Sequence, residues 1–287
     1  MPQAGTVLRH PCAAASTPSI RLWGRMQEEA RALIATDPLM AGPLCRAVLS
    51  HPCLAEALAA RLAAKLGDEE LDAAALRDVA REVFTDVPAV GDAATADLMA
   101  VQDRDPACPD LLTPFLHFKG YLALEAHRVA HELWHAGRAH LARHIQARVS
   151  EVFAVDIHPA ARFGCRVMLD HATGLVVGET AVVGDDVSIL QGVTLGGTGK
   201  ECGDRHPKVG RGVLIGAGAQ ILGNIRIGEG AKIGAGSVVL AHVPPFTTVV
   251  GVPARPVGQH RSLPALTMDH ALPEDEEEAR RWAGPAC

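Results

Sequence analysis

Apolar residues recur at every sixth position through much of the second half of the chain. Two unbroken series contain thirteen such positions, all of them apolar: Ile157, Phe163, Leu169, Leu175, Ala181, Val187 and Val193, followed by Val209, Ile215, Ile221, Ile227, Ile233 and Val239. Because 48% of the chain is hydrophobic, chance would produce this agreement roughly once in ten thousand trials. A six-residue period fits neither an α-helix nor a hairpin sheet, and it is typical of a parallel β-helix whose coil has three flat sides.

Small residues and glycines support the same interpretation. Four positions after the apolar residue the side chain is usually small, as at Ala161, Thr173, Ala219, Ala231 and Ser237. Glycine suits the tight turns of such a coil, and successive coils stack at the strand-pairing distance of about 4.8 Å. A glycine-rich disordered stretch is the weaker alternative, because disorder requires no register.

The two apolar series are out of phase with each other. The step from Val193 to Val209 is 16 residues, which is not a multiple of six. The polar segment GGTGKECGDRHPK (196–208) is therefore expected to loop out of the coil, where binding or catalytic groups are often found. Its GGTGK string is not a phosphate-binding loop, because Thr194 and Glu201 stand where that motif requires Gly and Ser or Thr.

The first half of the chain has a helical pattern. Residues 26–35, 53–66 and 70–84 are rich in Ala and Leu with helical apolar spacing, and one long helix is expected over about 114–149. The sequence thus predicts an α+β protein in which an all-α domain precedes a parallel β-helix of hexapeptide repeats. The expected divisions are a flexible N-terminus (1–20), a helical domain (21–152), the β-helix (153–255) with its loop, and a C-terminal tail (256–287) that contains the charge run 273–282.

Charge and cysteine content narrow the function classes. The net charge of −6 argues against a general nucleic-acid binder. The seven cysteines are scattered and contain no C-x-x-C, which favours a reducing compartment without a disulfide framework or a cysteine zinc site. No apolar run approaches the roughly 20 residues of a membrane helix, and the start of the chain does not resemble a secretory signal. We therefore expect a cytoplasmic protein.

One stretch of the last predicted helix matches a zinc-protease motif. His131, Glu132 and His135 spell H-E-x-x-H. Arg138 and Leu141 occupy the positions where one protease class continues with Gly and His, and Glu151, the downstream glutamate that another class would use, lies at the edge of the next domain. We interpret the histidines as one face of a helix. A carbonic anhydrase built on the same coil would gather three histidines, and His158, His171 and His242 are too dispersed for such a site.

Several strings in the chain resemble the serine O-acetyltransferase family over roughly residues 100–255. LDHATG (169–174) and GDRHPK (203–208) are the specific ones, and VDIHPAARFG (155–164), ILGNI (221–225) and GVPAR (251–255) agree with them. The resemblance implies a left-handed coil and the transfer of acetyl from acetyl-CoA to L-serine, the first step of cysteine synthesis. It implies no metal. The alternative is another hexapeptide-repeat O-acetyltransferase with a sugar, antibiotic or homoserine acceptor.

Acetyl transfer to a hydroxyl requires a base and a group that stabilises the oxyanion. His171 is suited to the first role, because imidazole titrates near neutral pH. The resemblance assigns Asp156 as the carboxylate partner of His171, and it gives His206 a role in holding serine or the oxyanion.

The zwitterionic form of L-serine calls for charges of both signs. Arg205, in the loop, offers its guanidinium to the serine carboxylate. The resemblance implies Asp105 and Asp170 as partners of the serine ammonium, and it places Glu179 in the site. Small residues that allow the pantetheine arm of acetyl-CoA to approach the backbone are Gly197, Thr198, Ala217 and Ala235, with Lys232 and Arg255 as candidates for the phosphates.

Assembly and partners also follow from the resemblance. The family forms trimers, or pairs of trimers joined through the helical domains, with catalytic sites between neighbouring subunits, and L-cysteine is implied as a feedback inhibitor. The family docks its C-terminus, usually a terminal isoleucine, into O-acetylserine sulfhydrylase. Because this chain ends in Cys287, we expect that complex to be weak or absent.

Overall fold

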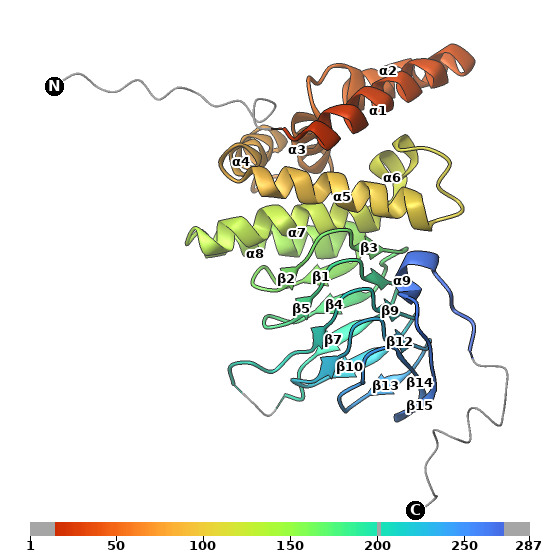
Figure 1. The fold of residues 1–287 in the computed structure, drawn as a ribbon. Helices are drawn as coiled ribbons and strands as arrows, with labels where there is room; N and C mark the ends of the chain where they lie inside the picture. The colour runs from red at the N-terminus through yellow and green to blue at the C-terminus, as the bar shows by residue number, and fades with distance from the viewer. Residues whose placement is uncertain (1–14, 200–201, 273–287) are drawn as a thin grey trace, which may run out of the picture. The chain divides into compact units, whose positions relative to one another are not determined.

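Helices occupy the chain as far as Phe153, and short strands take over from Val155 (Figure 1). The computed structural model describes residues 15–199 and 202–272. Two compact units are present, Met1–Thr95 and Ala96–Cys287. The division falls inside α5 (Pro88–Arg104), and not between residues 152 and 153, where the sequence pattern changes. The last helices therefore belong to the same compact unit as the strands.

The first unit is entirely helical. Its elements before α5 are α1 (Thr17–Thr36), η2 (Pro38–Met40), α2 (Ala41–Leu44), η3 (Cys45–Leu49), α3 (Leu54–Leu66) and α4 (Ala73–Asp86). The three expected helices correspond to α1, α3 and α4. Asp72 accepts a hydrogen bond from the Ala75 N–H (2.8 Å), so α4 begins after this cap and not at residue 70. Residues 17–20, which were expected in a flexible N-terminus, belong to α1, and residues 1–14 lie outside the described part of the chain.

The single long helix expected over 114–149 is wrong. Its place is taken by α6 (Leu112–His117), α7 (Lys119–His135) and α8 (Ala139–Phe153). Phe118 has an extended backbone between α6 and α7. Gly137, with φ +79°, ends α7 in a Schellman motif in which the Arg138 N–H bonds the Leu133 carbonyl (2.9 Å). The glycine was the sequence signal for this break, and α7 and α8 consequently pack against each other.

The strands form a left-handed parallel β-helix with three sheets as its sides. The first sheet contains β1 (Val155–Ile157), β4 (Leu175–Val177), β7 (Thr194–Gly196), β10 (Gln220–Leu222) and β13 (Val238–Val239). The second contains β2 (Arg162–Phe163), β5 (Val182–Val183), β8 (Lys208–Val209) and β11 (Arg226–Ile227). The third contains β3 (Met168–Leu169), β6 (Ser188–Ile189), β9 (Leu214–Ile215), β12 (Lys232–Ile233), β14 (Thr247–Gly251) and β15 (Ala254–Gln259). We call these sheets A, B and C. All pairings are parallel except that of β14 with β15.

The apolar residues of the six-residue period form the core of this coil. All thirteen periodic residues are buried except Phe163, which is half-buried. In the parallel register Ile157 stacks on Val177, and Ile221 stacks on Val239. Phe163 differs because it lies near the end of the coil, where its ring meets His127 of α7 at 5.1 Å between centroids.

Helices α7 and α8 cover the open end of the first coil (Figure 1). Helix α8 contacts β1, and α7 contacts β3. The contact of α7 is close at Gly120, where a Cβ would lie 1.9 Å from the Leu169 carbonyl oxygen. A glycine is therefore required at this point of the helix, despite its cost in helix propensity.

The segment expected to be a separate tail from residue 256 is in part integral to the coil. Strand β15 pairs with β14, and residues 263–271 cross the outer face of sheet C. There the Ser188 hydroxyl donates to the Ala265 carbonyl (3.0 Å), and the Lys232 ammonium donates to Asp269 (3.0 Å). The outer face of sheet C is buried as a result, including Ser188 and Lys232. The charge run 273–282 lies outside the described residues.

A buried ion cluster joins α5 and α7 to the first coil. The Arg128 guanidinium bonds the Asp97 carboxylate (2.5 Å) and the Gly164 carbonyl (2.7 Å), and the Val167 N–H donates to Asp97 (2.8 Å). Glu125 is also buried beside Arg128. Burial raises the pKa of the Asp97 and Glu125 carboxyls, and the charge of Arg128 opposes that shift. Arg128 thus provides the positive charge that compensates two buried carboxyl groups.

Replacing Arg128 by methionine is expected to lower the free energy of unfolding by about 3–5 kcal/mol, because the buried carboxyls lose their cation. Urea denaturation of both proteins measures the difference. The control is Arg148→Met, which breaks the ion pair with the exposed Glu151 on α8 and should cost under about 1 kcal/mol. Equal losses in the two variants would contradict the prediction.

The cysteine expectation holds in part. Cys45, Cys108, Cys165 and Cys202 are free thiols, whereas Cys53 is disulfide-bonded. In the part of the chain that is described, each helix is too short or too polar to cross a membrane.

Candidate active site

The predicted base stands on a strained turn at the junction of sheets C and A. His171 and Ala172, after β3, both have left-handed backbone angles (φ +53° and +60°), which residues with a Cβ rarely adopt. The His171 side chain is 75% exposed. Strain of this kind is often retained where function needs it, and here it directs an imidazole away from the coil.

Two carboxylates accompany this imidazole. The Asp170 carboxylate lies 3.9 Å from His171 Nε2. Burial raises the pKa of Asp170, the charge of His171 opposes that shift, and the negative charge of Asp105 adds to it. We call Asp105, Asp170 and His171 the histidine corner. It presents two acids and one imidazole to a ligand.

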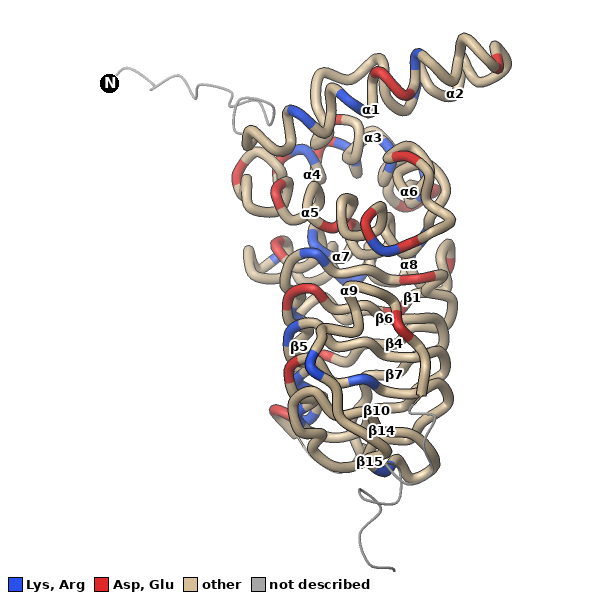
Figure 2. Tube along the Cα trace, turned by 45° about the vertical axis from the view of Figure 1, so that its right-hand side comes forward, with Lys and Arg blue, Asp and Glu red and all other residues tan. Residues whose placement is uncertain are grey.

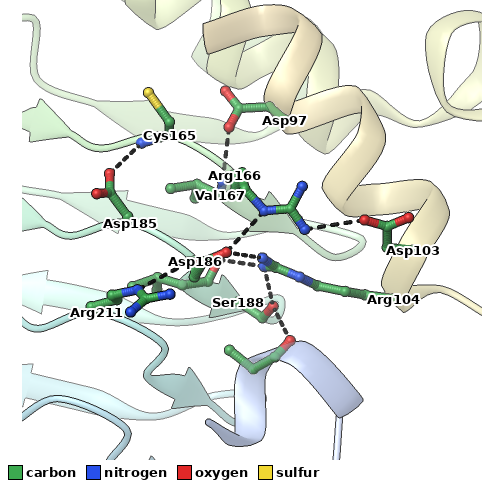
Figure 3. A network of polar contacts seen from close by, with 12 residues as sticks. Asp97, Asp103, Arg104, Cys165, Arg166, Val167, Asp185, Asp186, Ser188 and Arg211 are labelled. Carbon is green, nitrogen blue, oxygen red and sulfur yellow. Dashed lines mark hydrogen bonds and ion pairs between the residues drawn. The ribbon is translucent and has the colours of Figure 1, made fainter. Parts of the chain in front are cut away.

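Asp105 is positioned by the residue before it. The buried Arg104 guanidinium, at the end of α5, bonds Asp186 (3.0 Å) and the Ser188 hydroxyl (3.1 Å), as Figure 3 shows. Arg166 and Arg211 bond the same Asp186 carboxylate (3.0 and 3.1 Å). Charges alternate in sign along this edge of the coil beside β5 (Figure 2). Burial lowers the pKa of Arg104 to about 10, which leaves it charged at neutral pH and able to anchor the end of α5.

The loop residues meet at a different junction, between sheets A and B. Arg205 donates to the Glu179 carboxylate (2.9 Å). The Thr180 hydroxyl accepts the backbone N–H groups of Arg205 and His206 (3.0 and 3.1 Å), so it holds the returning strand of the loop. We call Glu179, Arg205 and His206 the arginine corner. The sequence interpretation missed Thr180, although it directly follows Glu179, which the resemblance places in the site.

His206 packs over a residue without a side chain. A Cβ at Gly178 would lie 2.0 Å from His206 Nε2, so only glycine admits the ring. The Thr180 N–H donates to His206 Nδ1 (3.2 Å), which places the proton of the neutral ring on Nε2. Burial, followed by the charge of Arg205, lowers the pKa of His206. The ring is therefore a neutral N–H donor, as an oxyanion requires.

Asp156 does not contact His171 within the described part of the chain. Its carboxylate accepts a hydrogen bond from Gln146 of α8 (2.7 Å), and its strand position pairs with Val176 on the outer face of sheet A. The only carboxylate within ion-pair distance of His171 among the described residues is that of Asp170. The pairing of His171 with Asp156 is thus not formed inside a single chain.

The small residues expected to line the pantetheine arm continue the two corners. In the parallel register, Ala217 and Ala235 follow β9 and β12 at the position where His171 follows β3. Gly197 and Thr198 follow β7 where Glu179 and Thr180 follow β4. Each corner therefore carries polar groups on its first coils and small residues on later ones.

Of the two phosphate candidates, one is excluded. The Lys232 side chain is buried, and its ammonium donates to Asp269 and to the Ala271 carbonyl (2.8 Å). Arg255 is exposed, and its guanidinium bonds only its neighbour's carbonyl oxygen, that of Ala254 (3.1 Å), in the structure described. A phosphate contact by Arg255 remains a prediction.

The histidines of the H-E-x-x-H motif are explained by packing. The His131 and His135 rings lie edge to face with centroids 4.5 Å apart, and His131 Nδ1 lies 2.7 Å from the Pro159 carbonyl. His127 is buried against Phe163. Across residues 15–199 and 202–272, the structure contains no group of three or more His, Cys, Asp or Glu side chains placed to hold a metal.

Comparisons with known proteins agree over most of the chain. A family model described as "Serine acetyltransferase, N-terminal" matches residues 22–126, and one described as "Bacterial transferase hexapeptide (six repeats)" matches residues 206–241. The chain is 54% identical to "Serine acetyltransferase 3, mitochondrial" of Arabidopsis thaliana over 86% of this chain and 65% of that protein's own length. It is also 54% identical to the serine acetyltransferase of Salmonella typhimurium, over 86% of this chain and 91% of the relative.

Solved structures give the same result. The serine acetyltransferase of Vibrio cholerae superposes with a TM-score of 0.87 at 53% identity, over 88% of this chain and 98% of that one. A soybean serine acetyltransferase in complex with serine has a TM-score of 0.82 at 54% identity, over 85% and 100%. A serine acetyltransferase in complex with cysteine has a TM-score of 0.87 at 48% identity, over 88% and 99%. The Brucella abortus enzyme in complex with coenzyme A has a TM-score of 0.83 at 49% identity, over 84% and 96%.

Proposed function

The chain belongs to the serine acetyltransferase family, and from that premise we propose that it transfers acetyl from acetyl-CoA to the hydroxyl of L-serine, giving O-acetyl-L-serine and CoA. The observation that carries the proposal is the histidine corner, where an exposed imidazole stands beside two acids. An amino-acid acceptor needs those acids for its ammonium, whereas a sugar does not. A sugar acceptor is therefore not favoured. L-Homoserine would need the same acids, and it is not favoured because the relatives that the chain matches are serine acetyltransferases.

The reaction uses His171 as a general base. The imidazole takes the proton of the serine hydroxyl while the hydroxyl oxygen attacks the acetyl carbonyl carbon. The resulting oxyanion accepts a hydrogen bond from His206 Nε2–H. When the intermediate collapses, the C–S bond breaks, and the CoA thiolate receives the proton from the imidazolium. Each group thereby returns to its starting state.

Serine is held by charges at both of its ends. Asp105 and Asp170 accept from the ammonium, and Arg205 donates to the carboxylate. Glu179 keeps the Arg205 guanidinium oriented, and the hydrogen bond from Arg205 lowers the pKa of Glu179. Acetyl-CoA lies along the small residues Ala217, Ala235, Gly197 and Thr198.

A complete site requires more than one copy of the chain. The histidine and arginine corners lie at different edges of the same coil, and Asp156 reaches neither His171 nor its turn. We propose a homotrimer, alone or paired into a hexamer, in which the histidine corner of one copy faces the arginine corner and Asp156 of the next. Val176, 40% exposed on the outer face of sheet A, is available for that interface.

The acceptor comparison tests the function. Thiol release from acetyl-CoA is measured with L-serine, L-homoserine and sugar acceptors at equal concentration. L-serine should give the highest kcat/KM, because the relatives that the chain matches are serine acetyltransferases. Absence of serine-dependent release would contradict the proposal.

Three further points stay predictions. L-cysteine is proposed to inhibit by occupying the serine position with its thiol in place of the hydroxyl. The expectation of a weak or absent complex with O-acetylserine sulfhydrylase concerns Cys287, which lies outside the described residues. A cytoplasmic location stays a prediction, and cell fractionation tests it.

A further inference from the structure

We propose that Lys208 and Asn224 are positioning residues of the arginine corner, which clamp the backbone on both sides of Arg205 and so place its guanidinium for the substrate carboxylate. The proposal rests on the function proposed above and adds to it two residues that no step of that reaction uses. In this role neither side chain acts on the acetyl group. We call the contacts among Asp204, Lys208 and Asn224 the loop clamp.

The returning strand of the loop lies between two turns of the coil. The Val182 N–H donates to the Pro207 carbonyl (3.0 Å), and the Lys208 N–H donates to the Ile225 carbonyl (2.8 Å). The turn that precedes β5 therefore lies on one side of this strand, and the turn that precedes β11 lies on the other. Side chains from both turns can reach the backbone that carries Arg205.

The Lys208 ammonium joins the two neighbours of Arg205. It donates to the Asp204 carboxylate (2.6 Å) and to the His206 carbonyl (2.6 Å). Its third contact is the side-chain oxygen of Asn224 (3.3 Å), so each N–H donor of the ammonium has an acceptor. Because one cation holds both Asp204 and His206, the backbone of the residue between them is restrained.

Asn224 holds the same segment from the next coil. Its amide nitrogen donates to the Asp204 carbonyl (3.0 Å), while its amide oxygen accepts from Lys208. The clamp therefore engages Asp204 at its carbonyl and at its carboxylate. The hydrogen bond from Lys208 also lowers the pKa of Asp204, which keeps this carboxylate charged at neutral pH.

The clamp complements the contacts on the other side of the segment. The Thr180 hydroxyl accepts the N–H groups of Arg205 and His206, and the His206 ring packs over Gly178. His206 is thus held by its ring and its N–H independently of the clamp. The Arg205 guanidinium lies at the end of a long side chain, where it meets Glu179, so a shift of the Arg205 backbone moves it. We expect loss of the clamp to weaken acceptor binding more than it slows the chemical step.

The clamp contributes little to folding stability. The side chains of Lys208 and Asp204 are 24% and 59% exposed, and ion pairs of this kind add little to the free energy of unfolding. Removal of the pair should therefore leave the coil folded. Kinetic effects of such a substitution then report on the position of Arg205.

Two substitutions remove the clamp from either side. Lys208→Met removes the ammonium and keeps an unbranched side chain, and Asn224→Leu removes the amide at similar size. We expect Lys208→Met to raise the KM for L-serine about 10- to 100-fold, because a small misplacement of a binding group is costly. Asn224→Leu should raise it less, since the ammonium remains. In both variants kcat and the KM for acetyl-CoA should stay near the wild-type values, the pattern of lost substrate binding.

The matched control breaks an ion pair far from the coil. Arg81→Met removes the pair with Asp78 on α4 (2.9 Å), whose side chains are 43% and 59% exposed. Its kinetics should be those of the wild type. Its thermal midpoint should lie close to that of Lys208→Met, because both variants lose a partly exposed pair.

A double-mutant cycle tests whether the clamp acts through Arg205. Lys208→Met is combined with Arg205→Ala, and kcat/KM for L-serine is measured for the two single variants and the double variant. If Lys208 serves to place the guanidinium, Lys208→Met has no further effect once the guanidinium is absent. A purely structural role would instead lower kcat/KM by the same factor in both backgrounds.

The outcomes are distinguishable. An unchanged KM for L-serine in Lys208→Met would overturn the proposal, as would an equal rise in the KM for acetyl-CoA. An equal loss in the Arg205→Ala background would overturn it as well. If the wild type itself showed no serine-dependent thiol release, the proposed function would fail instead.

Discussion

His171→Ala is expected to lower kcat with L-serine by about a hundred- to ten-thousandfold, the contribution of a general base. The side chain is 75% exposed, so its removal takes away no packing. The next residue, Ala172, already adopts the same left-handed backbone (φ +60°), so alanine can be accommodated in this turn and the turn is expected to persist. Thiol release at saturating serine and acetyl-CoA measures the loss.

The control for this variant removes an imidazole elsewhere on the coil. His242→Ala, at an exposed position on the last coil, should keep the wild-type rate. The thermal midpoint and the gel-filtration volume of His171→Ala should match those of the wild type. A near-native rate in His171→Ala would show that a different group accepts the serine proton.

Two inactive variants should regain activity when they assemble together. His171→Ala lacks the base, and Arg205→Ala lacks the partner of the serine carboxylate. At serine concentrations well below KM, each variant alone should retain about 1–10% of the wild-type rate or less. If each site takes one corner from each of two neighbours, random equimolar mixing leaves about a quarter of the sites with both corners intact.

Equal co-expression of the two variants is therefore expected to restore about a quarter of the wild-type rate per chain, with the ratio of chains measured by mass spectrometry. The control pairs His171→Ala with the double variant His171→Ala/Arg205→Ala, in which no copy retains the base, and recovery should be absent. If the His171→Ala and Arg205→Ala mixture also stayed inactive, both corners would have to act within one chain, and the proposed arrangement of the trimer would be wrong.

The β-helix was predictable from the sequence because its rule is local. Each coil turns at a constant interval, so an inward position such as Ile215 identifies the next one, Ile221, without knowledge of the fold. Helix ends follow local rules as well, but their signals are single residues. Gly137 was sufficient to divide α7 from α8, and the continuous apolar pattern on both sides of it obscured the break.

The resemblance to a family identified the site residues but not their arrangement in space. His171, Asp170, Arg205 and Glu179 were all identified from the sequence. Their separation into two corners depends on which residues of successive coils lie opposite each other. That register passes through a loop that breaks the period, so it is not contained in the spacing of the residues.

By itself, the sequence determined the coil, its inward residues, the looped-out segment and the residues with suitable chemistry, because each of these follows from residue type and from intervals along one strand of backbone. Only the tertiary structure decided that His206 packs over Gly178, that the Lys232 ammonium donates to Asp269, and that the segment after β15 covers sheet C. These contacts join residues at least 28 positions apart. They depend on side-chain shape and on pairing between coils, and a periodic sequence pattern contains no information about either.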